Sequence, residues 1–158
     1  MNFWTIDRVA AALTDAIHTK HPATPPEIRG ITTDSRAVAT GQLFVALAGE
    51  KFNGHDFIDS AVEKGAAAIV VSEPPEKDLG ISVFRVPDTL VALGQLANFW
   101  RRAWGGPIVM VAGSNGKTTT KDIIRAALGR SMKVHATTGN LNNRIGVPLT
   151  LLAIPSDC

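Results

Sequence analysis

Residues 113–120, Gly-Ser-Asn-Gly-Lys-Thr-Thr-Thr, have the types and spacing of a phosphate-binding loop. An apolar run precedes them and a helical pattern follows, which is the context that such a loop requires. Glycines at 113 and 116 let backbone N–H groups approach an anion, and the following helix adds the positive end of its dipole. The ammonium group of Lys117 suits the β- and γ-phosphates, and the hydroxyl of Thr118 suits Mg²⁺.

We therefore predict that this loop binds a nucleoside triphosphate with magnesium. Lys117 and Thr118 are the candidate catalytic residues, and Thr118 is the candidate metal ligand. The match to the standard motif is partial, because Val111 stands where that motif has its first glycine. An ordinary strand–turn–helix connection is the alternative, and the flanking patterns disfavour it. The full set of candidate nucleotide contacts is Gly113, Ser114, Asn115, Gly116, Lys117, Thr118 and Thr119.

A second polar loop, residues 137–148, follows the next expected strand at 133–136. Ligands of open α/β sheets bind beyond the carboxyl ends of the strands, so we expect this loop beside the phosphate loop. Asn140, Asn142 and Asn143 are therefore candidate substrate contacts. Spacing alone equally allows a polar turn in which Asn and Gly adopt unusual backbone angles. The position next to the triphosphate favours substrate contact.

Two polar segments nearer the amino terminus also follow expected strands. Hydroxyl and guanidinium donors at 35–36 suit a diphosphate, and an aromatic ring with an amide at 52–53 suits a nucleobase. Each segment taken singly is also typical of a solvated turn whose aspartates cap helices. The candidate contacts are Ser35, Arg36, Lys51, Phe52 and Asn53.

The composition indicates a soluble globular chain and argues against several classes of protein. The 158 residues are 45% hydrophobic and 19% charged, which is enough to bury a core. The net charge of +2 comes from dispersed Lys and Arg, so we expect no binding of nucleic acid. Cys158 is the single cysteine, which excludes an internal disulfide. Asp7 and Arg8 interrupt the first apolar stretch, so we expect no signal peptide, no membrane insertion and a cytoplasmic location.

Hydrophobic periodicity predicts an α/β fold in two units. Helices are expected at residues 6–16, 56–64, 88–102 and 117–128, and strands at 28–33, 42–47, 67–71, 81–86, 108–111 and 133–136. Gly105, Gly106 and Pro107 cannot continue a helix, so we place the boundary between residues 1–105 and residues 106–158. The second unit is expected to open with a strand–helix–strand unit around the phosphate loop.

These motifs together resemble the Mur ligases of bacterial peptidoglycan synthesis. The resemblance is carried by residues 33–36 (Thr-Asp-Ser-Arg), 41–49, 54–57 (Gly-His-Asp-Phe) and 113–119. Within the family, the Asn-rich run at 139–152 resembles the type that joins D-alanyl-D-alanine to UDP-N-acetylmuramoyl-tripeptide. The sibling that adds the third amino acid typically has a Thr-Thr-Pro-like element there. Ala112 stands where the family commonly has threonine, which matters little because the loop acts through its backbone.

The resemblance implies an N-terminal domain that holds UDP, here residues 1–105, and a central ATPase domain that begins at residue 106 and is incomplete here. It implies an ATP-dependent ligase that uses ATP and Mg²⁺, takes UDP-N-acetylmuramoyl-tripeptide and D-alanyl-D-alanine, and is a monomer at full length. The family's further magnesium ligands and carbamylated lysine would lie beyond residue 158, so we expect the chain alone to be inactive. The implied contacts are Ser35 and Arg36 for the diphosphate, Lys51, Phe52 and Asn53 for the uridine, and Asn140, Asn142 and Asn143 for the route from ATP to the sugar-peptide.

Three other functions remain open. The first is the sibling ligase that adds diaminopimelate or lysine. The second is a non-catalytic module that binds a UDP-sugar or a nucleotide. The third is a small kinase or GTPase, which the order of segments disfavours because such proteins usually carry the phosphate loop near the amino terminus.

Overall fold

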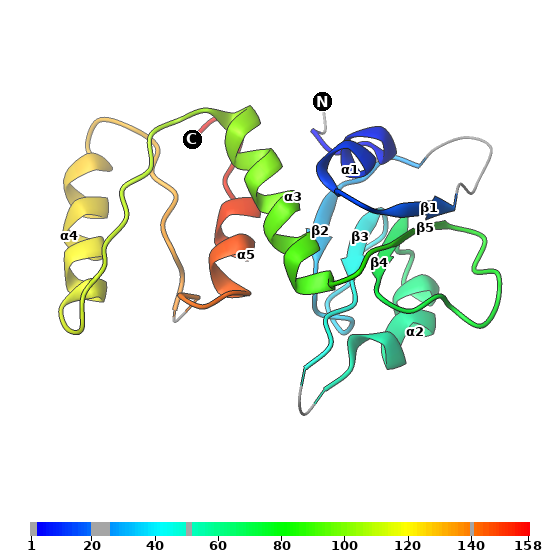
Figure 1. The fold of residues 1–158 in the computed structure, drawn as a ribbon. Coiled ribbons are helices and arrows are strands. Elements are labelled where there is room, and N and C mark those ends of the chain that lie inside the picture. Colours follow the sequence, from blue (N-terminus) through cyan, green and yellow to red (C-terminus); the bar gives the residue numbers. More distant parts are fainter. Residues whose placement is uncertain (1–2, 20–25, 50–51, 140) are drawn as a thin grey trace. The chain divides into compact units, whose positions relative to one another are not determined.

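The computed structural model describes residues 3–19, 26–49, 52–139 and 141–158, and it divides into two compact units, Met1–Leu96 and Ala97–Cys158. The first unit holds a five-stranded sheet with helices, and the second holds helices joined by irregular segments (Figure 1). The predicted α/β class is confirmed. The predicted domain boundary after residue 105 stays a prediction.

The sheet of the first unit has the order β1-β5-β4-β3-β2. Strands β2 to β5 run parallel, and β1 pairs antiparallel with β5 at one edge. The parallel strands correspond to the four strands predicted in this unit, each slightly shorter than expected. The bounds are β1 Ile17–Thr19, β2 Gly30–Thr32, β3 Gln42–Val45, β4 Ala68–Val71 and β5 Ser82–Arg85.

The first helix, α1 (Ile6–Ala12), begins as predicted and ends earlier than residue 16. The Thr5 hydroxyl accepts a hydrogen bond from the Arg8 backbone N–H at 3.2 Å and caps the helix. The backbone of Leu13 is extended, and Asp15 has a φ of 61°, so the chain turns here into β1. The sequence prediction missed β1, a three-residue strand that is exposed at both of its ends.

The remaining helices of this unit follow β3 and β5. A short 3₁₀ turn, η1 (Gly54–Phe57), leads into α2 (Ile58–Glu63), and α3 (Thr89–Trp104) has its residues 89–96 in the first unit. The Asp88 carboxylate accepts from the N–H groups of Leu90 at 2.7 Å and Val91 at 3.1 Å. Asp88 therefore caps α3.

The central strands are buried on both faces, which explains why their sequences are continuously apolar rather than alternating. On one face, Phe44, Ile69, Val71 and Val83 form a core cluster that includes Ile58 and Ala61 of α2. On the other face, the alternate residues of β3 and β4 are fully buried, and α1 and α3 contribute buried apolar side chains. These are Leu43, Val45, Ala68 and Val70 from the strands, with Ile6, Val9, Ala92, Leu93 and Leu96 from the helices.

We expect Gly54→Ala to destabilise the first unit by about 1–3 kcal/mol, because a side chain at this buried position overfills the core. A Cβ atom on Gly54 would lie 2.8 Å from both the backbone N and the backbone O of Leu47. Gly94→Ala is the control, since a Cβ at Gly94 in α3 would meet no atom within 4 Å apart from its chain neighbours and the helix's own backbone. That change should stabilise the unit by about 0.5–1 kcal/mol. Urea denaturation measures both effects, and equal midpoints for the two variants would contradict the prediction.

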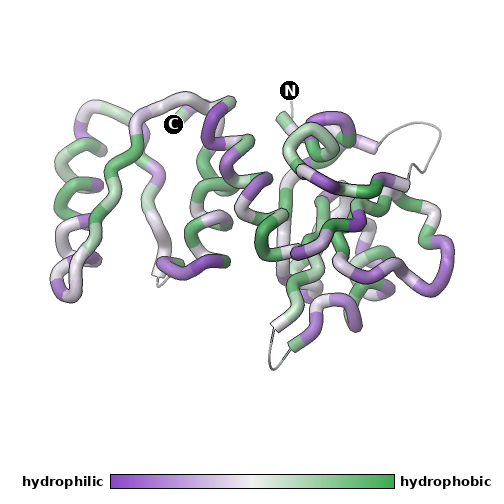
Figure 2. Tube along the Cα trace, in the orientation of Figure 1, coloured by the Kyte–Doolittle hydropathy of each residue, from purple (hydrophilic) through white to green (hydrophobic). Residues whose placement is uncertain are grey.

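The second unit contains α4 (Lys117–Leu128), α5 (Gly146–Leu152) and the end of α3. The bounds of α4 are those predicted. The strands predicted at 108–111 and 133–136 are wrong, because both segments are irregular and pair with no described residue. A strand exists only where a neighbour accepts and donates its backbone hydrogen bonds. The first segment is the apolar stretch before α4 in Figure 2, and Val109 and Met110 are 62% and 86% exposed.

The irregular segment at 133–138 runs between α4 and α5 (Figure 1). The Lys121 ammonium group on α4 donates to the Thr137 carbonyl at 2.8 Å. The His135 Nε2 atom lies 3.0 Å from the Thr150 carbonyl of α5. Side-chain contacts therefore hold this segment where a sheet ladder was expected. Across the described ranges of both units, no helix is both long and apolar enough for a bilayer crossing.

Candidate functional site

The candidate phosphate loop leads directly into α4. Gly113 has a φ of 149° and Gly116 a φ of 77°, backbone conformations that residues other than glycine rarely adopt. Gly116 is the residue that precedes α4, and no side chain caps the helix there. The first N–H groups of α4 therefore lie at the end of an exposed glycine-bounded turn, which is the arrangement that binds phosphate.

The Lys117 side chain folds back over this loop. Its Nζ atom donates to the carbonyl of Gly113 at 2.5 Å and to that of Ser114 at 3.2 Å. An anion at the loop would therefore compete with these carbonyl groups for the ammonium group. Thr118 and Thr119 are exposed in the first turn of α4, so their hydroxyl groups are accessible. The structure brings the predicted nucleotide contacts together around one helix end.

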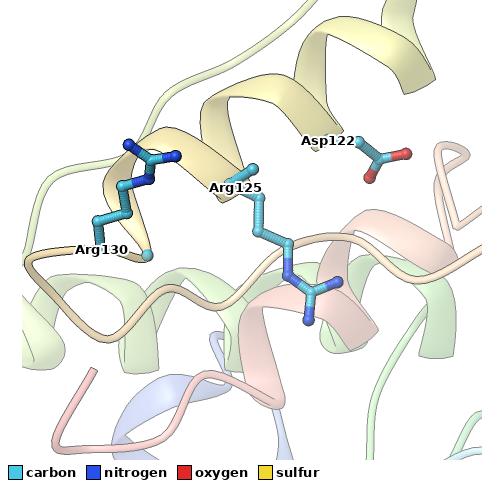
Figure 3. Close-up of a pocket in the computed structure, with 5 residues that line it drawn as sticks. Asp122, Arg125 and Arg130 are labelled. Atoms are coloured by element: carbon cyan, nitrogen blue, oxygen red, sulfur yellow. The ribbon is translucent and has the colours of Figure 1, made fainter.

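A shallow hollow on α4 lies at the opposite end of the helix from the loop. Asp122, Arg125, Ala126, Gly129 and Arg130 line it. Figure 3 shows Arg125 and Arg130 extending in different directions from the helix, so their guanidinium groups do not converge on one point. The carboxyl end of a helix carries the negative end of the dipole, which disfavours an anion. We therefore place the candidate nucleotide site at the loop and not at this hollow.

The Asn-rich loop leads into α5, and its asparagines differ in their surroundings. The Asn143 Oδ1 atom accepts from the N–H groups of Ile145 at 3.1 Å and Gly146 at 2.7 Å. This asparagine therefore caps the start of α5, which leaves its NH₂ group as the part that can contact a substrate. Asn142 is exposed, and Asn140 lies outside the described residues. The alternative of a polar turn and the predicted substrate contact are thus compatible for Asn143.

Lys121 is a residue of this region that sequence reasoning did not select. It lies one turn after Lys117 on α4, and its bond to the Thr137 carbonyl ties that helix to the start of the Asn-rich loop. Its side chain is 25% exposed and also lies 3.3 Å from an Asp122 carboxylate oxygen. The i, i+4 spacing of the two lysines was the available signal.

In the first unit, Ser35 and Arg36 follow β2 in a tight turn. Two nitrogens of the Arg36 guanidinium group donate to the Asp34 carboxylate at 2.9 and 2.8 Å, and the Arg36 backbone N–H donates at 2.9 Å. The Lys64 ammonium group donates to the carbonyl of the buried Ser35 at 2.8 Å. Asp34 therefore takes up two of the five N–H donors of the Arg36 guanidinium group, which was expected to face a diphosphate.

These contacts hold the pKa of Asp34 at about 2, because its carboxylate accepts the Arg36 side-chain and backbone bonds; its ordinary value is 3.8. In the folded chain this ion pair adds stability at neutral pH, and that contribution is lost as the pH falls from about 4 to about 2. We expect Arg36→Gln to raise the pKa of Asp34 while leaving it below 3.8, since the backbone bond remains. Carboxyl titration by NMR measures this. Arg29→Gln breaks a different ion pair, the one between Arg29 and Glu27, and should leave the pKa of Asp34 unchanged.

The candidate nucleobase contacts follow β3. The Phe52 ring is 53% exposed and stacks on the Phe57 ring with 4.8 Å between centroids and 12° between planes. The Asn53 Oδ1 atom accepts from the His55 backbone N–H at 3.1 Å and lies 2.8 Å from His55 Nδ1. Lys51 lies outside the described residues.

The parallel sheet places these two segments side by side at the carboxyl ends of its strands. Ser35 and Arg36 follow the carboxyl end of β2, and Phe52 and Asn53 follow that of the adjacent β3. Ligands of parallel sheets bind at this edge. The first unit thus has one candidate site of its own, and the phosphate loop of the second unit is another.

Comparisons with known proteins find matches to both parts of the chain. The family model "Mur ligase family, catalytic domain" matches residues 27–101, and "Mur ligase middle domain" matches residues 111–158. The UDP-N-acetylmuramoyl-tripeptide--D-alanyl-D-alanine ligase of Bacillus subtilis is 48% identical over 134 residues, which cover 82% of this chain and 29% of that protein.

Solved structures of MurF ligases are also similar to this chain. A crystal structure of MurF from Acinetobacter baumannii has a TM-score of 0.88 at 36% identity, covering 98% of this chain and 34% of that one. The MurF ligase of Thermotoga maritima in complex with ADP has a TM-score of 0.71 at 37% identity, covering 78% of this chain and 28% of that one. This chain thus spans about a third of the length of these relatives. Two family models match consecutive parts of the sequence and the fold agrees with solved members, so the chain belongs to the Mur ligase family.

Proposed function

We propose that this chain forms part of an ATP-dependent ligase that joins D-alanyl-D-alanine to UDP-N-acetylmuramoyl-tripeptide. The observation that carries the proposal is the glycine-bounded turn at the start of α4 with the Lys117 ammonium group folded over it. The named activity of the Bacillus subtilis relative and the ADP complex of the Thermotoga maritima relative support it. Residues 1–105 would hold the UDP compound, and residues 106–158 would begin the ATP-binding domain.

The residues present fit a nucleoside triphosphate with magnesium. Gly113 and Gly116 have the positive φ angles that suit glycine and carry no side chain to obstruct an anion, and the first N–H groups of α4 follow at once. Lys117 would exchange its loop carbonyl partners for phosphate oxygens. Thr118, exposed in the first helical turn, would be a ligand of Mg²⁺. When bound, Mg²⁺ would offset negative charge on the transferred phosphoryl group.

The chain's own residues would act by positioning and by neutralising charge. In the proposed reaction the terminal carboxylate of the tripeptide attacks the γ-phosphorus and ADP leaves, which yields an acyl phosphate. The amine of D-alanyl-D-alanine then attacks the acyl carbon, and phosphate leaves as the peptide bond forms. Lys117 would hold the γ-phosphate, and the NH₂ groups of Asn142 and Asn143 would contact the sugar-peptide, with Asn140 assigned from sequence.

The first unit would bind the UDP portion at the carboxyl edge of its sheet. Phe52 offers an exposed ring face for the uridine, and the Asn53 NH₂ group offers donors beside it. Ser35 and Arg36 would contact the diphosphate. Because Asp34 already bonds Arg36, the diphosphate would bind the remaining guanidinium N–H groups or displace Asp34.

Two experiments on the 158-residue chain test this proposal. Calorimetric titration should show that UDP-N-acetylmuramoyl-tripeptide binds without ATP. A chain that binds ATP but not the UDP compound would favour a kinase-like protein instead. A phosphate-release assay with the tripeptide compound, D-alanyl-D-alanine and ATP should show no turnover, because the second unit leaves apolar residues such as Val109 and Met110 exposed. Turnover by the chain alone would overturn the expected inactivity. In a longer version, activity with diaminopimelate or lysine in place of D-alanyl-D-alanine would indicate the sibling ligase.

A further inference from the structure

His55 lies between two segments of the first unit and contacts both. Its Nε2 atom lies 2.9 Å from the backbone N of Ser72, which directly follows β4. Its Nδ1 atom lies 2.8 Å from Asn53 Oδ1, in the loop that follows β3. The imidazole ring therefore joins the carboxyl end of β4 to the loop that follows the adjacent parallel strand β3.

The bond to Ser72 decides which nitrogen carries the proton. A backbone N–H can only donate, so His55 Nε2 must accept with its lone pair. In the neutral ring the proton then resides on Nδ1, which donates to Asn53 Oδ1. The Ser72 hydroxyl, 3.1 Å from Nε2, also donates to that atom. Both ring nitrogens of His55 are thus hydrogen-bonded within the protein.

The same bonds orient the Asn53 amide. Its Oδ1 atom accepts from both the backbone N–H and the ring of His55, so oxygen must occupy this position and the NH₂ group the other. The donors of Asn53 are therefore presented to a ligand in one orientation.

The loop itself is closed by its own backbone. Gly54 N–H donates to the Leu47 carbonyl at 2.7 Å, and Gly49 N–H donates to the Phe52 carbonyl at 2.9 Å. These bonds hold residues 47–49 beside residues 52–54, and the bonds of His55 to Ser72 anchor residues 53–55 to the neighbouring strand end. A binding site requires its contacts to be held within about 0.5 Å, which a loop attains only when such an anchor exists.

We propose that His55 is a positioning residue for the nucleobase end of the UDP compound. This rests on the proposed function, since it assumes that Phe52 and Asn53 meet that ligand. The Nδ1–H tautomer of His55 links the Asn53 amide, which adjoins Phe52, to Ser72 at the end of β4. His55 itself touches the loop and not the ligand.

The tautomer is tested first, without any ligand. Long-range ¹⁵N NMR of the chain in mildly alkaline solution should show His55 protonated on Nδ1 and unprotonated on Nε2. Protonation on Nε2 would overturn the proposal. This measurement is independent of the proposed function, so it separates a failure of the bond network from a failure of the ligand assignment.

Calorimetric titration with UDP-N-acetylmuramoyl-tripeptide then tests the positioning role. His55→Ala should weaken binding about tenfold or more, the effect of losing one or two hydrogen bonds that hold the site. His55→Gln keeps an acceptor near Nε2 and His55→Asn keeps a donor near Nδ1, so each should recover part of the affinity. His135→Ala is the matched control, because this histidine contacts the Thr150 carbonyl in the second unit, and it should bind within about twofold of the unchanged chain.

The possible outcomes of this titration distinguish a failure of the positioning role from a failure of the proposed function. Circular dichroism confirms that each variant is folded at the temperature of the measurement. Folded His55 variants that bind as tightly as the unchanged chain would overturn the positioning role and leave His55 a purely structural residue. An unchanged chain that does not bind the compound would overturn the proposed function, and the positioning role with it, whatever the tautomer.

Discussion

Replacing Lys117 with methionine should weaken the binding of ATP by about 10- to 100-fold. Hydrogen bonds from a charged group contribute about 1.5–3 kcal/mol each, and methionine keeps the length of the side chain while removing the charge and the donors. The measured loss is a net value, because Lys117 already bonds the Gly113 and Ser114 carbonyls before a nucleotide binds. Titration with a fluorescent ATP analogue in the presence of Mg²⁺ measures the change.

Lys133→Met is the matched control for charge. Lys133 follows the carboxyl end of α4, and its ammonium group pairs with the Asp157 carboxylate. The two variants change the net charge equally, so a general electrostatic effect would weaken both alike. Equal affinities for ATP in the two variants would contradict the assignment of Lys117.

Replacing Phe44 with alanine should destabilise the first unit by about 3–5 kcal/mol. Phe44 is fully buried in β3, where it pairs with Thr32 of β2 and Ile69 of β4. Its removal leaves a cavity in the core cluster to which α2 contributes, and the surrounding structure relaxes only partly to fill such a cavity. A loss of this size is comparable with the whole stability of many small domains. Urea denaturation followed by circular dichroism gives the change in the free energy of unfolding.

Phe52→Ala is the control for residue type. This phenylalanine is 53% exposed and stacks on Phe57, so its removal should cost about 1 kcal/mol. The prediction for Phe44 would be wrong if both variants unfolded at the same urea concentration.

The helix at 117–128 and the central strands were predictable because their signals are local. Gly116 and Gly129 bound a segment of helical periodicity, and α4 begins and ends there. The runs at 42–47 and 67–71 are continuously apolar because both faces of β3 and β4 are covered. The grouping of Phe52 and Asn53 after one strand, and of Ser35 and Arg36 after another, was likewise readable in chain order.

The errors lie where distant residues decide the outcome. β1 exists because His18 and its neighbours pair with β5, and the His18 ring stacks on Phe84 with 4.2 Å between centroids. The apolar segment at 108–111 has strand-forming residues, yet no described neighbour pairs with its backbone. The bonds of the Asn143 oxygen to the start of α5 also depend on the path of the whole loop, while its contact with a substrate stays a prediction.

The amino-acid sequence by itself determined the α/β class and the Mur ligase family and predicted the phosphate loop, because residue types, spacing and hydrophobic period are properties of short segments. The tertiary structure alone decided which polar atoms are already bonded. It showed Arg36 paired with Asp34, Lys117 bonded to its own loop, and His55 joining Asn53 to Ser72. A hydrogen bond requires two atoms within about 3 Å in a suitable direction, and only the folded chain brings such atoms together.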